Sequence, residues 1–370
     1  MECRKSSVEG VVMSLFGNAY HARRILLTGH TGFKGSWLAL WLRTLGAEVT
    51  GMALPPESTP NHWEVLAPDI LDHRVDIRDR DAVERVVMGA CPELVFHLAA
   101  QPLVRRSYRE PLETWSTNVQ GTANILEACR KTDSVRAVVV VTTDKCYENR
   151  EWVWGYREND VLGGFDPYSA SKAAVELLVA SYRQSFFKES GVLLATARAG
   201  NVIGGGDWSE DRLIPDLVRS VMAGSRSEIR SPNATRPWQH VLESLSGYLM
   251  LGERLLAGDR AFAEAWNFGP DRAGNRTVSD VLGSLCSHWP ALDWNEASVG
   301  HPHETTLLYL DCSKAHQKLG WRPVWDFDKG LAATAIWYRD FIESGAVISQ
   351  TQLANYVADA QAAGISWSKA

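Results

Sequence analysis

From residue 24 onward, short runs of apolar residues alternate with longer stretches in which apolar residues recur every three or four positions. A short continuous apolar run is typical of a strand buried on both faces, whereas the longer period is typical of a helix. The runs predict strands at residues 24–27, 48–54, 74–77, 94–98, 137–141 and 193–199, and the periodic stretches predict helices at residues 36–45, 115–131 and 168–188. This alternation predicts an α/β fold built on a doubly wound parallel sheet of the Rossmann type.

The pattern changes after three consecutive glycines at residues 204–206, beyond which the chain is richer in Trp, Pro and Arg. We therefore expect a larger Rossmann domain at residues 22–205 and a smaller, mixed C-terminal lobe at residues 206–370. Residues 240–256 have a helical pattern and residues 266–268 are suited to a strand, so residues 240–268 are expected to return to the larger domain. Residues 1–21 are expected to form a loose leader.

The composition argues against several classes of partner. The chain of 370 residues has a formal net charge of −6, which disfavours binding to nucleic-acid phosphates, and it has no apolar run of membrane-spanning length. Its six cysteines are scattered without a CxxC pair, which indicates reduced thiols in a cytoplasm. The sequence His-Pro-His-Glu at residues 301–304 lacks the helical spacing of a metal motif, so no metal site is expected.

A glycine-rich turn lies between the first predicted strand and the first predicted helix. Its spacing is GxxGxxG: the first glycine permits a tight turn, the second admits a pyrophosphate to the backbone, and the third lets the helix pack against the strand. The N–H groups at the start of the helix then face the anion. The turn predicts a dinucleotide site that includes Gly29, Thr31, Gly32, Phe33, Lys34 and Gly35.

The second predicted strand ends in Ala53 and Leu54, so it carries neither an acidic partner for the ribose nor an Arg for a 2′-phosphate. This pattern favours NAD over NADP. Asp76, near the third predicted strand, is a candidate for a contact with the adenine. An acidic residue that caps the end of a strand is an equally good explanation of Asp76.

Tyr168 and Lys172 are four residues apart and therefore lie on one face of a helix, one turn apart. A tyrosine has a pKa of about 10, so it is ionised in only about one molecule in a thousand at neutral pH. A lysine cation beside it favours the phenolate and lowers that pKa toward the range of a general base. Thr143, after the fifth predicted strand, is placed to share a substrate oxygen with Tyr168.

These features occur in an order that resembles the extended short-chain dehydrogenase/reductase family. The resemblance rests on the glycine turn, residues 97–101 (His-Leu-Ala-Ala-Gln), residues 117–122 (Thr-Asn-Val-Gln-Gly-Thr), residues 142–144 (Thr-Thr-Asp) and the Tyr168/Lys172 pair. It implies an NAD cofactor, with the ribose within reach of Lys172. It also implies that the cofactor site includes Asp76, Ile77, Leu98, Ala99, Ala100, Asn118, Tyr168 and Lys172.

Within that family, residues 29–35, 143–149, 198–208 and 236–241 are similar to the corresponding segments of the CDP-glucose 4,6-dehydratases. The similarity implies oxidation of CDP-glucose at C4 with Tyr168 as the base, loss of water across C5 and C6, and return of the stored hydride to C6. Asp144 would help hydroxide to leave C6. Lys145 stands where the dTDP-glucose enzymes carry Glu, and it is either the group that acts at C5 or an electrostatic clamp on the enolate or the diphosphate.

The same resemblance implies which residues bind the substrate, an oligomeric state and a cellular role. Arg is suited to bidentate phosphate contacts, and the expected substrate-binding residues are Gln101, Asn201, Arg212 and Arg236. The two long predicted helices occupy the place where the family forms a dimeric four-helix bundle, so a homodimer or a higher homo-oligomer is expected. The implied role is that of a cytoplasmic hydro-lyase in deoxysugar biosynthesis, such as that of lipopolysaccharide O-antigen.

Two other classes of function stay open. Another nucleotide-sugar enzyme of this fold, such as a 4-epimerase or a decarboxylase, needs no acid–base pair for elimination, so Asp144 and Lys145 argue against it. A non-catalytic nucleotide-sensing protein could use the same fold. The complete set of Thr143, Tyr168 and Lys172 argues against that second class.

Overall fold

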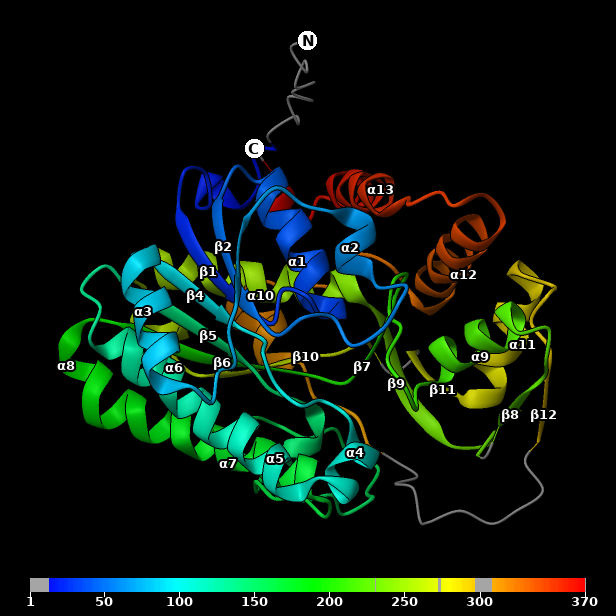
Figure 1. The fold of residues 1–370 in the computed structure, drawn as a ribbon, viewed down its shortest axis with the longest axis horizontal. Helices are drawn as coiled ribbons and strands as arrows, with labels where there is room; N and C mark the ends of the chain where they lie inside the picture. The colour runs from blue at the N-terminus through cyan, green and yellow to red at the C-terminus, as the bar shows by residue number, and fades with distance from the viewer. Residues whose placement is uncertain (1–12, 230, 272–273, 297–307, 370) are drawn as a thin grey trace, which may run out of the picture.

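The computed structural model describes residues 13–229, 231–271, 274–296 and 308–369 (Figure 1). Among these residues, seven parallel strands form a central sheet in the order β10-β6-β5-β4-β1-β2-β3. The strands are β1 (Arg24–Thr28), β2 (Glu48–Ala53), β3 (Leu71–Arg74), β4 (Leu94–His97), β5 (Ala137–Val141), β6 (Leu193–Ala199) and β10 (Ala265–Phe268). The strand order reverses between β1 and β4, as it does in doubly wound sheets. The predicted fold class is confirmed.

The sheet is buried on both faces because its strands send alternate apolar side chains into two cores. In β5, Val138 and Val140 belong to one core, whereas Ala137, Val139 and Val141 belong to the other. The first core also contains α3 (Arg80–Ala90), α6 (Gly121–Arg130) and α7 (Pro167–Tyr182), and the second contains α1 (Phe33–Thr44) and α10 (Val241–Leu256). α10 and β10 therefore fold with the large sheet.

The third strand was predicted wrongly at residues 74–77, because β3 spans Leu71–Arg74. β3 lies at the edge of the sheet and its side chains are mostly exposed, so it has no apolar run. The apolar residues Val75 and Ile77 come after the strand and pack into the core that also contains α3, α6 and α7. The apolar residues of 74–77 thus belong mainly to a buried loop and not to the strand.

Each long predicted helix contains a π-helical turn. α5 (Pro111–Trp115) runs through a π-helical turn at Ser116–Gln120 into α6. α7 runs through another at Arg183–Phe187 into α8 (Lys188–Ser190). Asn118, which lies in the first of these turns, is buried.

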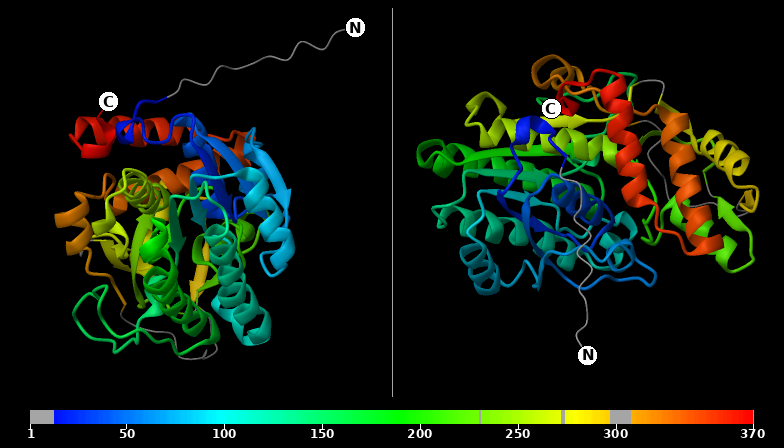
Figure 2. Two further views of the ribbon diagram at one scale, coloured as in Figure 1. Left: turned by 90° about the vertical axis from the view of Figure 1, so that its left-hand side faces the viewer. Right: turned by 90° about the horizontal axis from the view of Figure 1, so that it is seen from above.

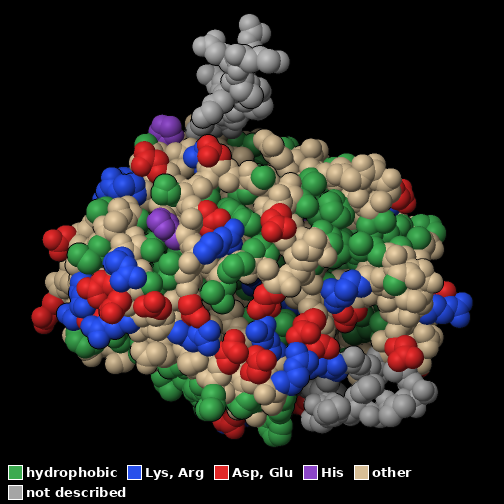
Figure 3. Space-filling model, viewed as in Figure 1, with side chains coloured by type: hydrophobic (Ala, Val, Ile, Leu, Met, Phe, Trp, Pro, Cys, Tyr) green, Lys and Arg blue, Asp and Glu red, His purple; other side chains and the backbone are tan. Residues whose placement is uncertain are grey.

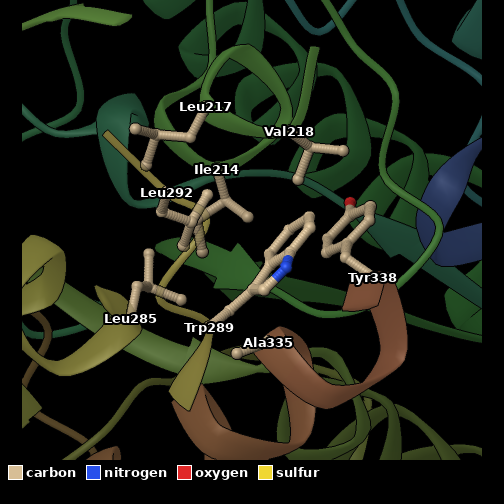
Figure 4. Close-up of a pocket in the computed structure, with 8 residues that line it drawn as sticks. All are labelled: Ile214, Leu217, Val218, Leu285, Trp289, Leu292, Ala335 and Tyr338. Carbon is tan, nitrogen blue, oxygen red and sulfur yellow. The ribbon is translucent and has the colours of Figure 1, made fainter. Parts of the chain in front are cut away.

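The smaller lobe contains two short sheets and several helices. β7 (Asn201–Ile203), β9 (Thr235–His240) and β11 (Asn275–Thr277) form one sheet, and β8 (Ser227–Ile229) pairs with β12 (Trp294–Glu296). Between α9 (Leu213–Met222), α11 (Val278–His288) and α12 (Phe327–Ser344), the side chains of Leu217, Trp289 and Tyr338 converge in a small apolar core (Figure 4). Because β7 precedes residue 206, the lobe's sheet begins before the predicted boundary.

The expectation of a loose leader is wrong for residues 13–21. A 3₁₀ turn at Phe16–Asn18 lies there, and the Phe16 ring is buried and stacks on Trp367 with ring centroids 5.0 Å apart. α13 (Ser349–Ala362) also leaves the lobe and packs against α1, where Tyr356 contacts Trp41 (Figures 1 and 2). Phe16 also packs against Trp41, so the partners of the leader lie in several distant parts of the chain, which no local pattern reveals. Residues 1–12 lie outside the described residues.

Two further findings concern the classes of partner. Across the described ranges, no helix combines the length and the apolar character that crossing a bilayer requires. In the same ranges, no three His, Cys, Asp or Glu side chains gather as they would around a metal ion, and residues 301–304 lie outside those ranges. On the face seen in Figure 3, Lys and Arg are interspersed with Asp and Glu, so this face presents no continuous basic surface.

Candidate active site

The glycine turn joins β1 to α1 and leaves no room for a side chain at its first and last glycines. Gly29 has a φ of +74°, and a Cβ there would lie 2.7 Å from the backbone nitrogen of Ala99. A Cβ at Gly35 would lie 2.0 Å from the carbonyl oxygen of Gly29. Gly32 is exposed, and α1, whose first N–H groups have no partner within the helix, begins directly after it. This cradle fits the pyrophosphate of a dinucleotide such as NAD.

The predicted adenine end of the site lies beside this turn. The Thr31 hydroxyl donates to the carbonyl oxygen of Leu54, 2.9 Å away, and ties the turn to the end of β2. Asp76 forms a 2.6 Å ion pair with Arg78, and the hydrogen bonds from that guanidinium lower the pKa of Asp76. A contact of Asp76 with an adenine stays a prediction.

The loop after β4 is held by two of the predicted site residues. The backbone N–H of Gln101 donates to Asn118 Oδ1 (2.8 Å), and Asn118 Nδ2 donates back to the carbonyl oxygen of Gln101 (3.1 Å). The side-chain amide of Gln101 donates to Thr114 Oγ1 at 2.8 Å and is buried. These side chains therefore fix the loop that carries Leu98, Ala99 and Ala100, and a direct contact of Gln101 with substrate stays a prediction.

Thr143, Asp144 and Lys145 form one polar group at the end of β5. Thr143 caps a 3₁₀ turn at Asp144–Cys146, and its hydroxyl donates to Asp144 Oδ1 at 3.0 Å. Lys145 Nζ lies 3.6 Å from the same Oδ1 atom. The carboxylate of Asp144 is almost completely buried, whereas Lys145 is about one-third exposed at 32% of its side chain. The group thus combines a hydroxyl, a carboxylate and an amine at the end of one strand.

Tyr168 and Lys172 face this group from the first turns of α7. The hydroxyl of Thr143 lies near the phenol of Tyr168 and favours its ionised form, and Lys172 Nζ donates to the carbonyl oxygen of Val141 at 3.2 Å. The expected lowering of the Tyr168 pKa is not what the structure gives: burial, the largest effect, raises this pKa to about 12, although the Thr143 hydroxyl opposes the rise. Burial also lowers the pKa of Lys172 to about 8. Helical spacing predicted that the pair shares a face but not how deeply it is buried.

Sequence reasoning missed the environment of Lys34 and the role of Tyr248. Lys34 Nζ lies 3.3 Å from the hydroxyl of Tyr248, which comes from α10. Burial is the largest effect on Lys34 and lowers its pKa to about 7, and the charges of Arg212, Asp144 and Lys172 also act on it. The side chain of Lys34 therefore points from the glycine turn into the catalytic group. No local signal pairs residues so distant in sequence.

Three of the four predicted substrate residues, Asn201, Arg212 and Arg236, lie on the lobe side, whereas Gln101 lies in the loop after β4. Arg212 forms a 2.8 Å ion pair with Asp207, and its charge acts on both Lys34 and Tyr168. Asn201 starts β7 and pairs with Trp238 of β9, the strand that also carries Arg236. The structure thus brings Arg212 to the catalytic group and sets Arg236 farther along the lobe's sheet.

Comparisons with known proteins agree with this architecture. Residues 25–269 match the profile of the NAD dependent epimerase/dehydratase family. The chain is 46% identical to the CDP-glucose 4,6-dehydratase of Salmonella typhimurium over 92% of this chain and 98% of that protein. Two similar solved structures, each 25% identical, are a dTDP-glucose 4,6-dehydratase of Streptomyces venezuelae with NAD bound (TM-score 0.71, covering 86% and 97% of the chains) and a UDP-glucose 4-epimerase of Thermotoga maritima (TM-score 0.73, 86% and 99%).

Replacing Tyr168 with Phe removes one hydroxyl from the catalytic group. We expect turnover of a nucleotide-sugar substrate to fall by about 10²- to 10⁴-fold, the usual loss when a general acid–base group is removed. Thermal stability and NAD binding, measured by circular dichroism and calorimetry, should change little. Tyr108→Phe, at an exposed tyrosine of α4 (Val104–Arg109), is the matched control. A Tyr168→Phe enzyme within about tenfold of wild type would exclude the role of Tyr168.

Proposed function

The chain belongs to the NAD dependent epimerase/dehydratase family, and on that premise we propose that it is a CDP-glucose 4,6-dehydratase. The reaction converts CDP-glucose to CDP-4-dehydro-6-deoxyglucose and water. The observation that carries the proposal is the high identity to the Salmonella typhimurium enzyme over nearly the whole chain. The presence of Asp144 and Lys145 beside Thr143 and Tyr168 supplies the chemistry that the reaction needs.

The first step of the proposed reaction is oxidation at C4 of the glucose. The glycine cradle would hold NAD, which would supply a hydride acceptor for C4 and a hydride donor for C6. Tyr168 removes the proton of the C4 hydroxyl, and Thr143, whose hydroxyl lies near the phenol, orients the same oxygen. Because burial raises the pKa of Tyr168 to about 12, this proton transfer needs positive charge near the phenol. The charge of Arg212 lowers that pKa, and we assign Lys172, one helical turn along α7, as a second source of positive charge.

The second step is loss of water across C5 and C6. The new ketone at C4 acidifies the proton at C5, so a base at C5 and an acid at C6 are required. We assign the acid to Asp144, which is buried and held by the hydroxyl of Thr143. We assign the group acting at C5 to Lys145, whose amine lies 3.6 Å from Asp144 Oδ1 and whose side chain is 32% exposed. The carboxyl group thus gives a proton to the departing hydroxide while the neighbouring amine takes the proton of C5, and the amine returns that proton to C5 when hydride is added at C6.

The CDP moiety needs donors for its two phosphates. Arg212 lies near the catalytic group, and Arg236 and Asn201 lie on the adjoining sheet of the lobe. A guanidinium can bind a phosphate with two parallel hydrogen bonds. We therefore propose that the diphosphate lies between Arg212 and Arg236, with the glucose directed toward Tyr168.

We expect the protein to convert CDP-glucose faster than UDP-glucose or dTDP-glucose to a product whose 4-keto group absorbs ultraviolet light in alkali. The hydride is returned within each turnover, so reduced cofactor should not accumulate in step with product. The Tyr168→Phe variant is the inactive control. Formation of an epimerised sugar without loss of water would identify an epimerase instead, and no change in any of the three substrates would favour a non-catalytic protein.

Two substitutions separate the possible roles of Lys145. Lys145→Ala removes both the amine and the charge, whereas Lys145→Arg keeps a positive charge that cannot act as a base. If Lys145 is the base, both variants should lose exchange of the C5 hydrogen with solvent deuterium by about 10²-fold or more. Exchange is measured by mass spectrometry of the sugar. Wild-type exchange in Lys145→Arg, together with a loss in Lys145→Ala, would reduce Lys145 to an electrostatic clamp.

We also propose that the enzyme is a homodimer. Large apolar side chains are exposed on neighbouring helices at one side of the larger domain, namely Tyr108 on α4, Leu112 and Trp115 on α5, and Leu177 on α7. Soluble monomers rarely expose apolar residues in groups. These helices follow β4 and β5, so two copies can pair through them as a helix bundle.

The variant Leu112→Glu/Leu177→Glu places charges in this proposed interface. It should shift the protein from dimer to monomer in size-exclusion chromatography with light scattering, because buried unpaired carboxylates oppose association. Met88→Glu on α3 is the control, since Met88 is an exposed apolar residue away from α5 and α7. An unchanged dimer in the double variant would contradict this interface.

A cytoplasmic location and a role in deoxysugar biosynthesis complete the proposal. The described cysteines are free thiols, and Cys129, Cys146 and Cys312 among them are buried. Free thiols persist in a reducing compartment. The proposed 4-keto-6-deoxy product is a substrate for reductases or aminotransferases, the classes of reaction that act on a ketone.

A further inference from the structure

A buried ion pair lies behind the catalytic group and has no part in the steps described above. Arg198 Nη2 on β6 lies 2.7 Å from Glu176 Oε2 on α7, and each side chain is only 3% exposed. Burial disfavours the charge on Glu176, but the charge and hydrogen bond of Arg198 and hydrogen bonds from Thr142 and Thr196 hold its pKa below the usual range. A buried pair of this kind is weak evidence of a stabilising role, because desolvation offsets the attraction. Glu176 and Arg198 also hydrogen-bond to residues on either side of the catalytic segment.

The carboxylate of Glu176 holds the chain just before the catalytic group. The hydroxyl of Thr142 donates to Glu176 Oε1 at 2.5 Å, and the hydroxyl of Thr196 donates to Oε2 at 2.8 Å. Thr142 directly precedes Thr143, and its backbone N–H is bonded to the carbonyl oxygen of Ala197 at 2.9 Å. The start of the catalytic segment is thus fixed to both α7 and β6.

The guanidinium of Arg198 holds the chain just after the catalytic group. Its Nη1 donates to the hydroxyl of Tyr147 at 2.7 Å and to the carbonyl oxygen of Glu158 at 3.1 Å. Tyr147 ends the 3₁₀ turn that carries Asp144 and Lys145, and its hydroxyl donates to Asn267 Oδ1 at 2.8 Å. The pair therefore grips residues on both sides of the segment 143–146.

Glu176 also belongs to the helix face that carries the proton-transfer pair. Tyr168, Lys172 and Glu176 follow one another at intervals of four residues on α7, so they lie along one side of the helix. One face of α7 therefore carries the Tyr168 phenol and the Lys172 amine. One turn further on, Glu176 on the same face accepts the hydrogen bond from Thr142, the residue before Thr143. This bond links the position of α7, and hence of Tyr168, to that of Thr143.

We propose that Glu176 and Arg198 are positioning residues that hold Thr143, Asp144 and Lys145 in register with Tyr168. The inference rests on the proposed function, since it assigns these two residues to the same dehydratase site. They do not touch the substrate. They act by fixing both ends of the catalytic segment to the helix and the strand on either side of it.

Tyr147→Phe is the mildest test, because it removes only the hydroxyl that Arg198 holds. We expect kcat to fall by about 10- to 100-fold while KM stays within about threefold, because misplacement of catalytic groups by a fraction of an ångström to one ångström costs rate more than binding. Glu176→Leu/Arg198→Met removes both charges together, so neither remains buried without a partner, and it should lower kcat at least as much. Both variants are compared with wild type by steady-state kinetics and thermal unfolding.

Val83→Ala is the matched control, since it creates a cavity in the core beneath α3, away from the catalytic segment. It should lower the melting temperature with little change in kcat. A folded Tyr147→Phe or double variant with wild-type kcat would overturn the inference, as would a kcat loss in Val83→Ala equal to that in Tyr147→Phe. If the double variant does not fold, Tyr147→Phe decides the question.

The same measurements separate this inference from the proposed function. Kinetics are measured on whichever of CDP-glucose, UDP-glucose and dTDP-glucose the wild-type enzyme converts. A wild type that converts a substrate other than CDP-glucose contradicts the proposed substrate and leaves the role of Glu176 and Arg198 to be decided by the variants. An active wild type with equally active variants contradicts only the positioning role.

Discussion

The site depends on the close approach of the glycine turn to the end of the neighbouring strand. A Cβ at Gly29 would lie within 2.7 Å of the Ala99 nitrogen, so β1 and the loop after β4 can meet only through glycine. The hydroxyl of Thr28 strengthens this junction, because it accepts hydrogen bonds from the N–H groups of Leu98 and Ala99, each at 3.1 Å. The cofactor cradle and the loop after β4 are thereby fixed together at the carboxyl ends of the strands. The catalytic group at the end of β5 lies at the same end of the sheet, because the strands are parallel.

The parts of this arrangement that were predictable from the sequence are those encoded within a few residues. β5 is a continuous apolar run, β6 is a largely apolar one, and both were predicted with their observed bounds, whereas the exposed edge strand β3 has no such run and was placed wrongly. The Tyr168/Lys172 spacing is likewise local. The bond between Lys34 and Tyr248 and the stacking of Phe16 on Trp367 join distant parts of the chain, and only the folded structure reveals them.

Burial controls the protonation of the catalytic side chains more than their mutual charges do. It is the largest effect on Tyr168, Lys172 and Lys34, and in each it favours the neutral form. Burial raises the pKa of Tyr168 to about 12 and lowers that of Lys172 to about 8 and that of Lys34 to about 7. A phosphate-bearing ligand close to the two amines favours their charged forms and raises both pKa values. Ligand binding and proton uptake by the amines are therefore linked, and each favours the other.

The same fold serves epimerases and dehydratases, so the difference in chemistry has to lie in a few side chains. Oxidation at C4 needs only the Tyr168 group, whereas elimination needs a proton donor close to C6 as well. Gly200, which follows β6, leaves space for the side chain of Asp144: a Cβ at Gly200 would lie 2.9 Å from Asp144 Oδ2, so a side chain there would displace the carboxylate. Arg198, two residues earlier and within β6, holds Tyr147 at the end of the turn that carries Asp144. Residues 198–200 thus both leave space for the side chain of Asp144 and hold the turn that carries it, and in the proposed reaction this carboxyl group is the proton donor that elimination requires beyond oxidation.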